Sequence, residues 1–151
     1  MNLYAIKING LNNPVGFDYE QLLCSWKVKN SCGHSQKWTR IAVSLDKTMT
    51  SIIYEKKGVL NSAGEVLEIS LEPYTRYYYQ ITVHSDADEE CSSDICYFET
   101  AKLQDPWSAD WLGVQDGDVH PEFRKTFSIN KKVKTAKIYI CGLGVFETYL
   151  G

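Results

Sequence analysis

Several features that would assign the chain to a familiar class are missing from its sequence. No stretch approaches the ~20 consecutive apolar residues of a membrane span. The first seven residues lack the charged start and the continuous apolar run of a secretory signal. The formal net charge of −3 offers no broad basic field for a phosphate backbone or a membrane surface. We therefore expect a soluble cytoplasmic protein that binds neither nucleic acid nor membrane.

The sequence also lacks a recognisable metal or cofactor motif. Its five cysteines include no CxxC pair, and no histidine lies at zinc-ligand spacing from them. We expect free thiols, with a Cys91–Cys96 bridge across a hairpin as the open alternative. The acidic bend at residues 86–90 could attract calcium, but its spacing does not suit an oxygen cage, and a solvated hairpin tip is favoured. We therefore expect no metal and no cofactor in this chain.

No window of the sequence holds an apolar stripe at helical spacing over three turns. Apolar and polar residues instead alternate with the period of two that a half-buried strand requires. The pattern predicts inward positions at Leu22, Cys24, Trp26 and Val28, and again at Ile41, Val43 and Leu45. Further strands are predicted at residues 51–54, followed by a turn at 55–58, and at residues 66–71. The chain is therefore predicted to be all-β.

The densest signal lies at residues 71–83, where a proline precedes an aromatic strand. Pro73 marks a corner, and Tyr77, Tyr79, Ile81 and Val83 share one strand face. The spacing of Leu71, Pro73, Thr75 and Tyr77 resembles the fibronectin type III pattern Leu-x-Pro-x-Thr-x-Tyr, over roughly residues 14–101. The resemblance implies an immunoglobulin-like sandwich at residues 1–102, with Trp26 in its core. It also implies a tyrosine corner, in which the Tyr77 hydroxyl bonds the upstream backbone.

A different region begins after the short linker at residues 102–106. Residues 123–129, 133–140 and 145–150 each have the composition of a strand, and Gly142 and Gly144 permit a bend before the last one. These strands are too few for a second sandwich. We therefore expect residues 103–151 to be the truncated start of a second, jelly-roll-like β-sandwich related to carbohydrate-binding modules.

Three short motifs follow one another in this second region. Residues 107–112 read Trp-Ser-Ala-Asp-Trp-Leu, residues 123–127 read Phe-Arg-Lys-Thr-Phe, and residues 136–147 end in Gly-Leu-Gly-Val-Phe-Glu. Together with the preceding fibronectin-like part, this order resembles the N-terminal region of bacterial α-L-rhamnosidases of glycoside hydrolase family 78. Phe146 stands where that family usually has tyrosine.

The resemblance implies a non-catalytic accessory region of an enzyme that hydrolyses terminal α-L-rhamnosides by inversion. Such a region would act as a spacer and packing partner, and could present substrate. The implied partners are the missing C-terminal domains and rhamnose-containing glycans, and the whole enzyme could use calcium. An inverting glycosidase needs one carboxylic acid and one carboxylate. The family supplies them from a later helical barrel, and no residue of this chain matches them.

No other residue of the chain makes a convincing catalytic group. Glu122, Glu147 and the three histidines lack a pocket, a perturbing partner or a metal-ligand spacing. Exposed aromatic rings can stack on sugars through their apolar faces. The candidates for such carbohydrate binding are Trp107, Trp111, Phe146 and Tyr149, although packing in a core is the favoured interpretation for all four.

A function of a different class is also consistent with the pattern. Fibronectin-type domains often serve as stand-alone interaction or adhesion modules that use exposed strand edges. The unfinished second region adds open edges and apolar faces of its own. We therefore also expect either self-association through residues 123–150 or disorder of this tail.

Overall fold

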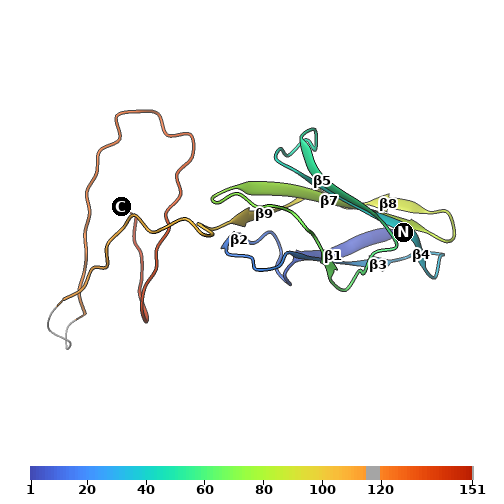
Figure 1. Cartoon of the computed structure of the whole chain (residues 1–151), viewed down its shortest axis with the longest axis horizontal. Helices are drawn as coiled ribbons and strands as arrows, with labels where there is room; N and C mark the ends of the chain where they lie inside the picture. Colours follow the sequence, from blue (N-terminus) through green and yellow to red (C-terminus); the bar gives the residue numbers. More distant parts are fainter. Residues whose placement is uncertain (115–119, 151) are drawn as a thin grey trace. The chain divides into compact units, whose positions relative to one another are not determined.

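The computed structural model describes residues 1–114 and 120–150, and its first hundred residues form a β-sandwich (Figure 1). Contacts divide the chain into two compact units, Met1–Ser108 and Ala109–Gly151. The described residues contain no helix. In chain order the strands are β1 Asn2–Ile8, β2 Val15–Phe17, β3 Leu23–Lys29, β4 Gln36–Ser44, β5 Ile52–Gly58, β6 Glu65–Val66, β7 Arg76–Ser85, β8 Glu90–Ser92 and β9 Cys96–Thr100. The prediction of an all-β sandwich is confirmed.

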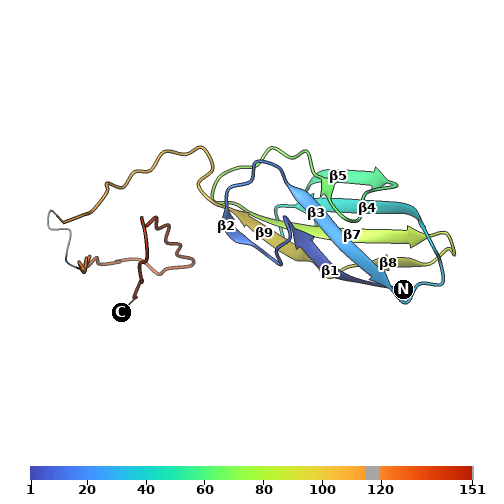
Figure 2. The same ribbon diagram turned by 90° about the horizontal axis from the view of Figure 1, so that it is seen from below.

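Two sheets form the layers of the sandwich. One has the order β1-β3-β6, and the other has the order β2-β9-β7-β4-β5, with β8 paired to β7 beyond the end of β9. Figure 2 shows β1 and β3 crossing in front of β4, β7 and β9. Neighbouring strands are antiparallel, except that the short β2 runs parallel to β9. The sandwich therefore begins at Asn2, twelve residues before the fibronectin-like pattern starts.

The core lies between the sheets and is built from the predicted aromatic strand. Tyr77, Tyr79, Ile81 and Val83 of β7 are all buried, as is Trp26 of β3 on the opposite sheet. The Tyr77 ring stacks on Phe98 of β9, with the ring centroids 5.1 Å apart. Burying side chains of this size stabilises the fold by about 1.5–3 kcal/mol each. The prediction that these positions share an inward face is therefore confirmed.

The alternation fails at the ends of two strands. Val28 and Leu45 were predicted to point inward, but they are 38% and 50% exposed. Val28 lies near the end of β3, and Leu45 lies just beyond the end of β4, where the opposite sheet no longer covers them. The prediction of inward side chains at these two positions is therefore wrong.

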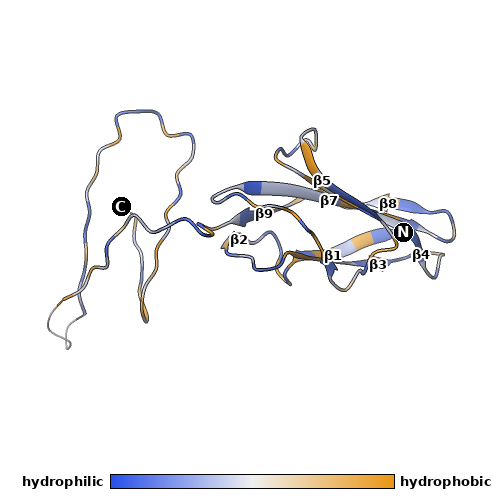
Figure 3. Cartoon of the chain, viewed as in Figure 1, coloured by the Kyte–Doolittle hydropathy of each residue, from blue (hydrophilic) through white to orange (hydrophobic). Residues whose placement is uncertain are grey.

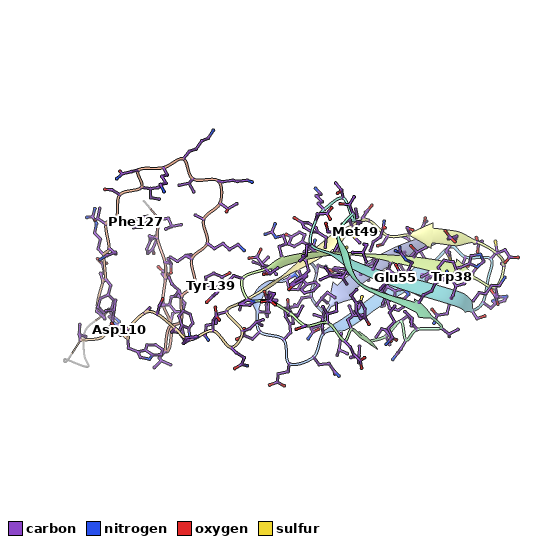
Figure 4. The ribbon with its side chains drawn as sticks, turned by 45° about the horizontal axis from the view of Figure 1, so that its top comes forward. Trp38, Met49, Glu55, Asp110, Phe127 and Tyr139 are labelled. Carbon is purple, nitrogen blue, oxygen red and sulfur yellow. The ribbon has the colours of Figure 1, made fainter. Side chains whose placement is uncertain are left out.

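Two predicted elements differ from the observed ones. Residues 55–58 were predicted to be a turn, but they continue β5. Their side chains contact the neighbouring β4: Glu55 pairs with Arg40, and the Lys57 ammonium lies over the Trp38 ring. Figure 4 labels Trp38 and Glu55 on this sheet. Residues 66–71 were predicted to be a strand, but β6 ends at Val66. Leu67 still packs in the core, and its amide bonds the Leu22 carbonyl, while the following backbone turns irregularly.

The acidic bend after β7 is bonded to the rest of the sandwich and is not merely solvated. Asp86 accepts hydrogen bonds from the His34 amide and the Ser35 hydroxyl, and Asp88 pairs with Lys37. The Glu89 carboxylate accepts from the Ser31 hydroxyl and the Cys32 amide. The bend joins β7 to β8 and holds the loop between β3 and β4 in place. The bend is the exposed hairpin tip that the sequence predicts, and its carboxylates also bond the neighbouring loop.

The second unit has no strand in its described residues, 109–114 and 120–150. The strands predicted at residues 123–129, 133–140 and 145–150 are therefore wrong for this chain. Hydrophobic and hydrophilic residues do alternate along this part of the trace (Figure 3). Apolar side chains such as Phe127, Leu143 and Val145 are nevertheless exposed, because no sheet covers them. A strand pattern without a partner strand gains neither ladder hydrogen bonds nor burial.

Candidate functional site

The end of the sandwich from which the chain leaves β9 is fixed by the predicted tyrosine corner. The Tyr77 hydroxyl accepts a hydrogen bond of 2.8 Å from the Glu72 amide, and the Thr75 hydroxyl donates to the Pro73 carbonyl. The Thr100 hydroxyl donates to the Glu72 carbonyl and accepts from the Thr75 amide. These bonds tie the corner before β7 to the last residue of β9. The structural roles predicted for Pro73, Thr75 and Tyr77 are thus visible in the contacts, and Leu71 packs against the core.

A shallow groove of about 400 Å³ opens beside this corner. Its Tyr19 ring meets Phe98 edge-on, with centroids 5.8 Å apart, and Asp18 accepts a hydrogen bond from the Leu103 amide. The Tyr19 hydroxyl is buried without a hydrogen-bond partner among the described residues, and burial raises its pKa to about 12. The lining residues are Asp18, Tyr19, Glu20, Ile69, Leu71, Leu103 and Gln104. The apolar side chains of the lining suit packing of a neighbouring apolar side chain.

Sequence reasoning did not find this groove, which we call the exit groove. Its residues come from the loop before β3, the irregular segment after β6 and the segment after β9. No spacing rule links positions so far apart in the chain. Only the linker at residues 102–106 indicated that this end of the domain leads onward.

A second groove of about 280 Å³ lies along β1. Its lining includes Asn12, Asn13, Asp94 and Cys96, and the Asn13 side chain accepts a hydrogen bond from the Tyr97 amide. Burial raises the pKa of the Cys96 thiol, which disfavours the reactive thiolate. This groove holds one carboxylate and no basic side chain, so it lacks the components of a hydrolytic site.

The carboxylates of the sandwich have a structural role. An inverting glycosidase needs an acid whose pKa is raised so that it keeps its proton. Here the pKa of Glu89 falls to about 2, first because the Ser31 hydroxyl donates to it and then because the Cys32 amide does. Hydrogen bonds also lower the pKa of Asp46, chiefly from Thr48, and of Asp86, chiefly from Ser35. These groups stay ionised and anchor loops.

Neither a metal cluster nor a disulfide is present in the described part of the chain. No group of three His, Cys, Asp or Glu side chains there is placed to hold a metal ion. The cysteines are free thiols, including Cys91 and Cys96, whose pairing had been left open. No helix of the described residues is long and apolar enough to cross a bilayer.

The four candidate sugar-binding aromatics are exposed. Trp107 lies in the first unit, with the Lys102 ammonium 5.7 Å from its ring centre. Trp111, Phe146 and Tyr149 lie in the second unit, where the Tyr149 hydroxyl donates to Glu147. Their exposed fractions range from 49% to 83%, so this chain does not bury them in a core. Sugar binding by these rings stays a prediction.

The family description "Rha78A-like, N-terminal immunoglobulin domain" matches residues 3–104, which comprise all of the sandwich except Asn2. The chain belongs to this family. The match begins at β1, so the first strand, which the fibronectin-like pattern missed, is part of the family domain. The tyrosine corner and the inward Trp26 are therefore features of a Rha78A-like immunoglobulin domain in this chain.

Curated relatives extend the likeness beyond this Rha78A-like domain. An α-L-rhamnosidase from Formosa agariphila is 27% identical over 96% of this chain and 19% of its own length. An α-L-rhamnosidase from Alteromonas sp. is 22% identical over 93% of this chain and 18% of its own length. The chain thus spans less than a fifth of these relatives, and the likeness continues well past residue 104.

Solved structures show the same fold. A Streptomyces avermitilis α-L-rhamnosidase, complexed with L-rhamnose, matches 74% of this chain and 12% of its own, with a TM-score of 0.62 and 19% identity. The α-L-rhamnosidase of Dictyoglumus thermophilum matches 70% of this chain and 13% of its own, with a TM-score of 0.58 and 23% identity. Both fold matches reach only a small part of a much longer enzyme.

Proposed function

We propose that this chain is a non-catalytic accessory region of an α-L-rhamnosidase. The observation that carries the proposal is the pair of curated relatives, in which nearly the whole chain aligns with less than a fifth of an α-L-rhamnosidase. The catalytic acid and carboxylate, which together act by inversion on terminal α-L-rhamnosides, would come from the rest of that enzyme. Any calcium requirement would also belong to the rest.

The exit groove supports a role as spacer and packing partner. The tyrosine corner fixes the backbone where the chain leaves the sandwich, and the exit groove offers Ile69, Leu71 and Leu103 beside it. A rigid exit next to an apolar surface suits packing against a neighbouring domain, since contacts between domains combine apolar area with a few polar bonds.

A domain graft tests the accessory role. In the Formosa agariphila α-L-rhamnosidase, the region that matches this chain would be deleted, replaced by this chain, or replaced by an unrelated β-sandwich of similar length. We expect the deletion and the unrelated graft to yield little soluble, active enzyme, because packing surfaces are lost. Replacement with this chain should restore most of the activity on an aryl α-L-rhamnoside. Full activity of the deletion enzyme would refute the proposal.

Substrate presentation would require the exposed aromatic rings to contact sugar. L-Rhamnose titrated into the chain should then change the tryptophan fluorescence, and Trp107→Ala and Trp111→Ala should each reduce that change. Trp26→Phe is a control for general perturbation, since Trp26 is buried. The titration is repeated with calcium. An unchanged spectrum in both conditions would confine the role to spacing and packing.

A further inference from the structure

The charges of the chain are separated between its two parts. Residues 1–108 contain ten basic and fourteen acidic residues, whereas no acidic residue occurs between Glu122 and Glu147. That acid-free stretch carries six cations, at positions 124, 125, 131, 132, 134 and 137. The net charge of −3 for the whole chain conceals this basic segment, defined here as residues 124–137.

The six cations of the basic segment are exposed, and five of them have no partner among the described acids. All six have exposed side chains. No described carboxylate pairs with Arg124, Lys125, Lys131, Lys132 or Lys134, whereas Lys37, Arg40, Lys56 and Arg76 of the sandwich each have a carboxylate partner. Like charges so close along a chain, with no counter-charge between them, create a local positive potential that attracts anions.

Rings and apolar side chains alternate with these cations along the trace. Phe123 and Phe127 are more than half exposed, and Figure 4 shows Phe127 and Tyr139 on the second unit. No strand of the described residues includes this segment, so its backbone groups are not paired in a sheet there. A ligand with regularly spaced anionic groups and hydrophobic ring faces matches both features.

We propose that the basic segment binds an anionic polysaccharide, one whose sugar rings carry carboxylate or sulfate groups. The choice of a glycan over other polyanions rests on the proposed function, since the segment lies in the part shared with α-L-rhamnosidases. Lysine and arginine donate charge-assisted hydrogen bonds to carboxylate and sulfate oxygens, and the aromatic side chains cover the apolar ring faces. Binding weakens as salt screens the charges.

Binding is measured by isothermal titration of the full chain with four polymers. Polygalacturonate supplies carboxylates, and dextran sulfate supplies sulfates. Dextran is the neutral control. Duplex DNA is the control for polyanions in general, because its charges are backbone phosphates and not carboxylates or sulfates on sugar rings. Lys131→Gln/Lys132→Gln/Lys134→Gln removes three charges from the basic segment. The matched control, Lys27→Gln/Lys29→Gln/Lys47→Gln, removes three exposed charges from the sandwich. Both triple variants have the same net charge.

At about 20 mM salt we expect the chain to bind at least one anionic glycan and not dextran, and to release it near 300 mM. The variant of the basic segment should lose about tenfold or more in affinity, and the control about twofold or less. Equal losses in both variants, no binding to either anionic glycan, or tighter binding to DNA would overturn the proposal. If the chain binds no anionic glycan but the domain graft restores activity, the accessory role stands and the glycan proposal fails. If the graft fails but the basic segment binds an anionic glycan, the glycan proposal stands and the accessory role fails.

Discussion

The tyrosine corner depends on the hydroxyl group of one residue, Tyr77. The Tyr77 ring packs in the core, and its hydroxyl satisfies the Glu72 amide. We expect Tyr77→Phe to lower the free energy of unfolding by about 1 kcal/mol, because the amide loses its partner while the ring still fills its space. Urea denaturation measures the change. Tyr4→Phe, at an exposed ring, is the matched control, and an equal effect of both substitutions would contradict the role of the corner.

Glu89 makes stability depend on pH in a defined direction. Its folded pKa of about 2 lies below the unfolded value of ~4.3, so it stabilises the sandwich above the unfolded pKa. That contribution is lost as the pH falls from about 5 towards 2. We expect Glu89→Gln to flatten the fall of unfolding free energy over this range, as followed by urea titrations. If the unfolding free energy of Glu89→Gln fell with the same slope as that of the wild type, the assignment would be refuted.

The strands of the sandwich could be predicted from the sequence where buried residues alternate with exposed ones, but not where a strand lies at the edge of a sheet. The alternation at Tyr77–Val83 is unambiguous, because β7 lies between neighbours and its inner face is wholly buried. The edge strand β5 contains Glu55, Lys56 and Lys57, a composition that indicates a turn when its partners on β4 are unknown. The residues of the exit groove carried no signal, because the groove forms only when three separate segments meet.

Edge strand β5 is also joined to the opposite sheet by a charged pair. The Lys56 ammonium lies 2.6 Å from the Glu65 carboxylate of β6 and also donates to the Val66 carbonyl. A charge directed inward from an edge strand opposes pairing with another chain, which weakens the alternative of an adhesion module that uses this edge. We expect Lys56→Met to destabilise the sandwich by about 1–2 kcal/mol, because mostly buried Glu65 loses its partner.

A double-mutant cycle with Glu65→Gln isolates this contribution from β5 and β6. The double variant should be less destabilised than the sum of the single variants, since the uncompensated charge is absent. Additive effects in urea denaturation would show that the pair does not connect the two sheets.

At the scale of the whole molecule, the core of the described residues lies in the sandwich, and the described apolar side chains of the second unit are exposed. We expect residues 1–102 to keep their β-sheet circular dichroism and cooperative melting after deletion of residues 103–151, because the buried core side chains of the described residues all lie within the retained part. The intact chain should self-associate in light scattering, more strongly at high salt, where the cations of the basic segment repel less. Unfolding of the shortened chain, or a monomeric intact chain at high concentration and salt, would contradict this division.

The proposed function is that this chain supplies structure to an α-L-rhamnosidase and no catalytic group of its own. Release of the aryl group from an aryl α-L-rhamnoside by the isolated 151-residue chain tests it most directly. The account predicts release at the uncatalysed rate. Faster release that a single Asp→Asn or Glu→Gln substitution abolishes would contradict it.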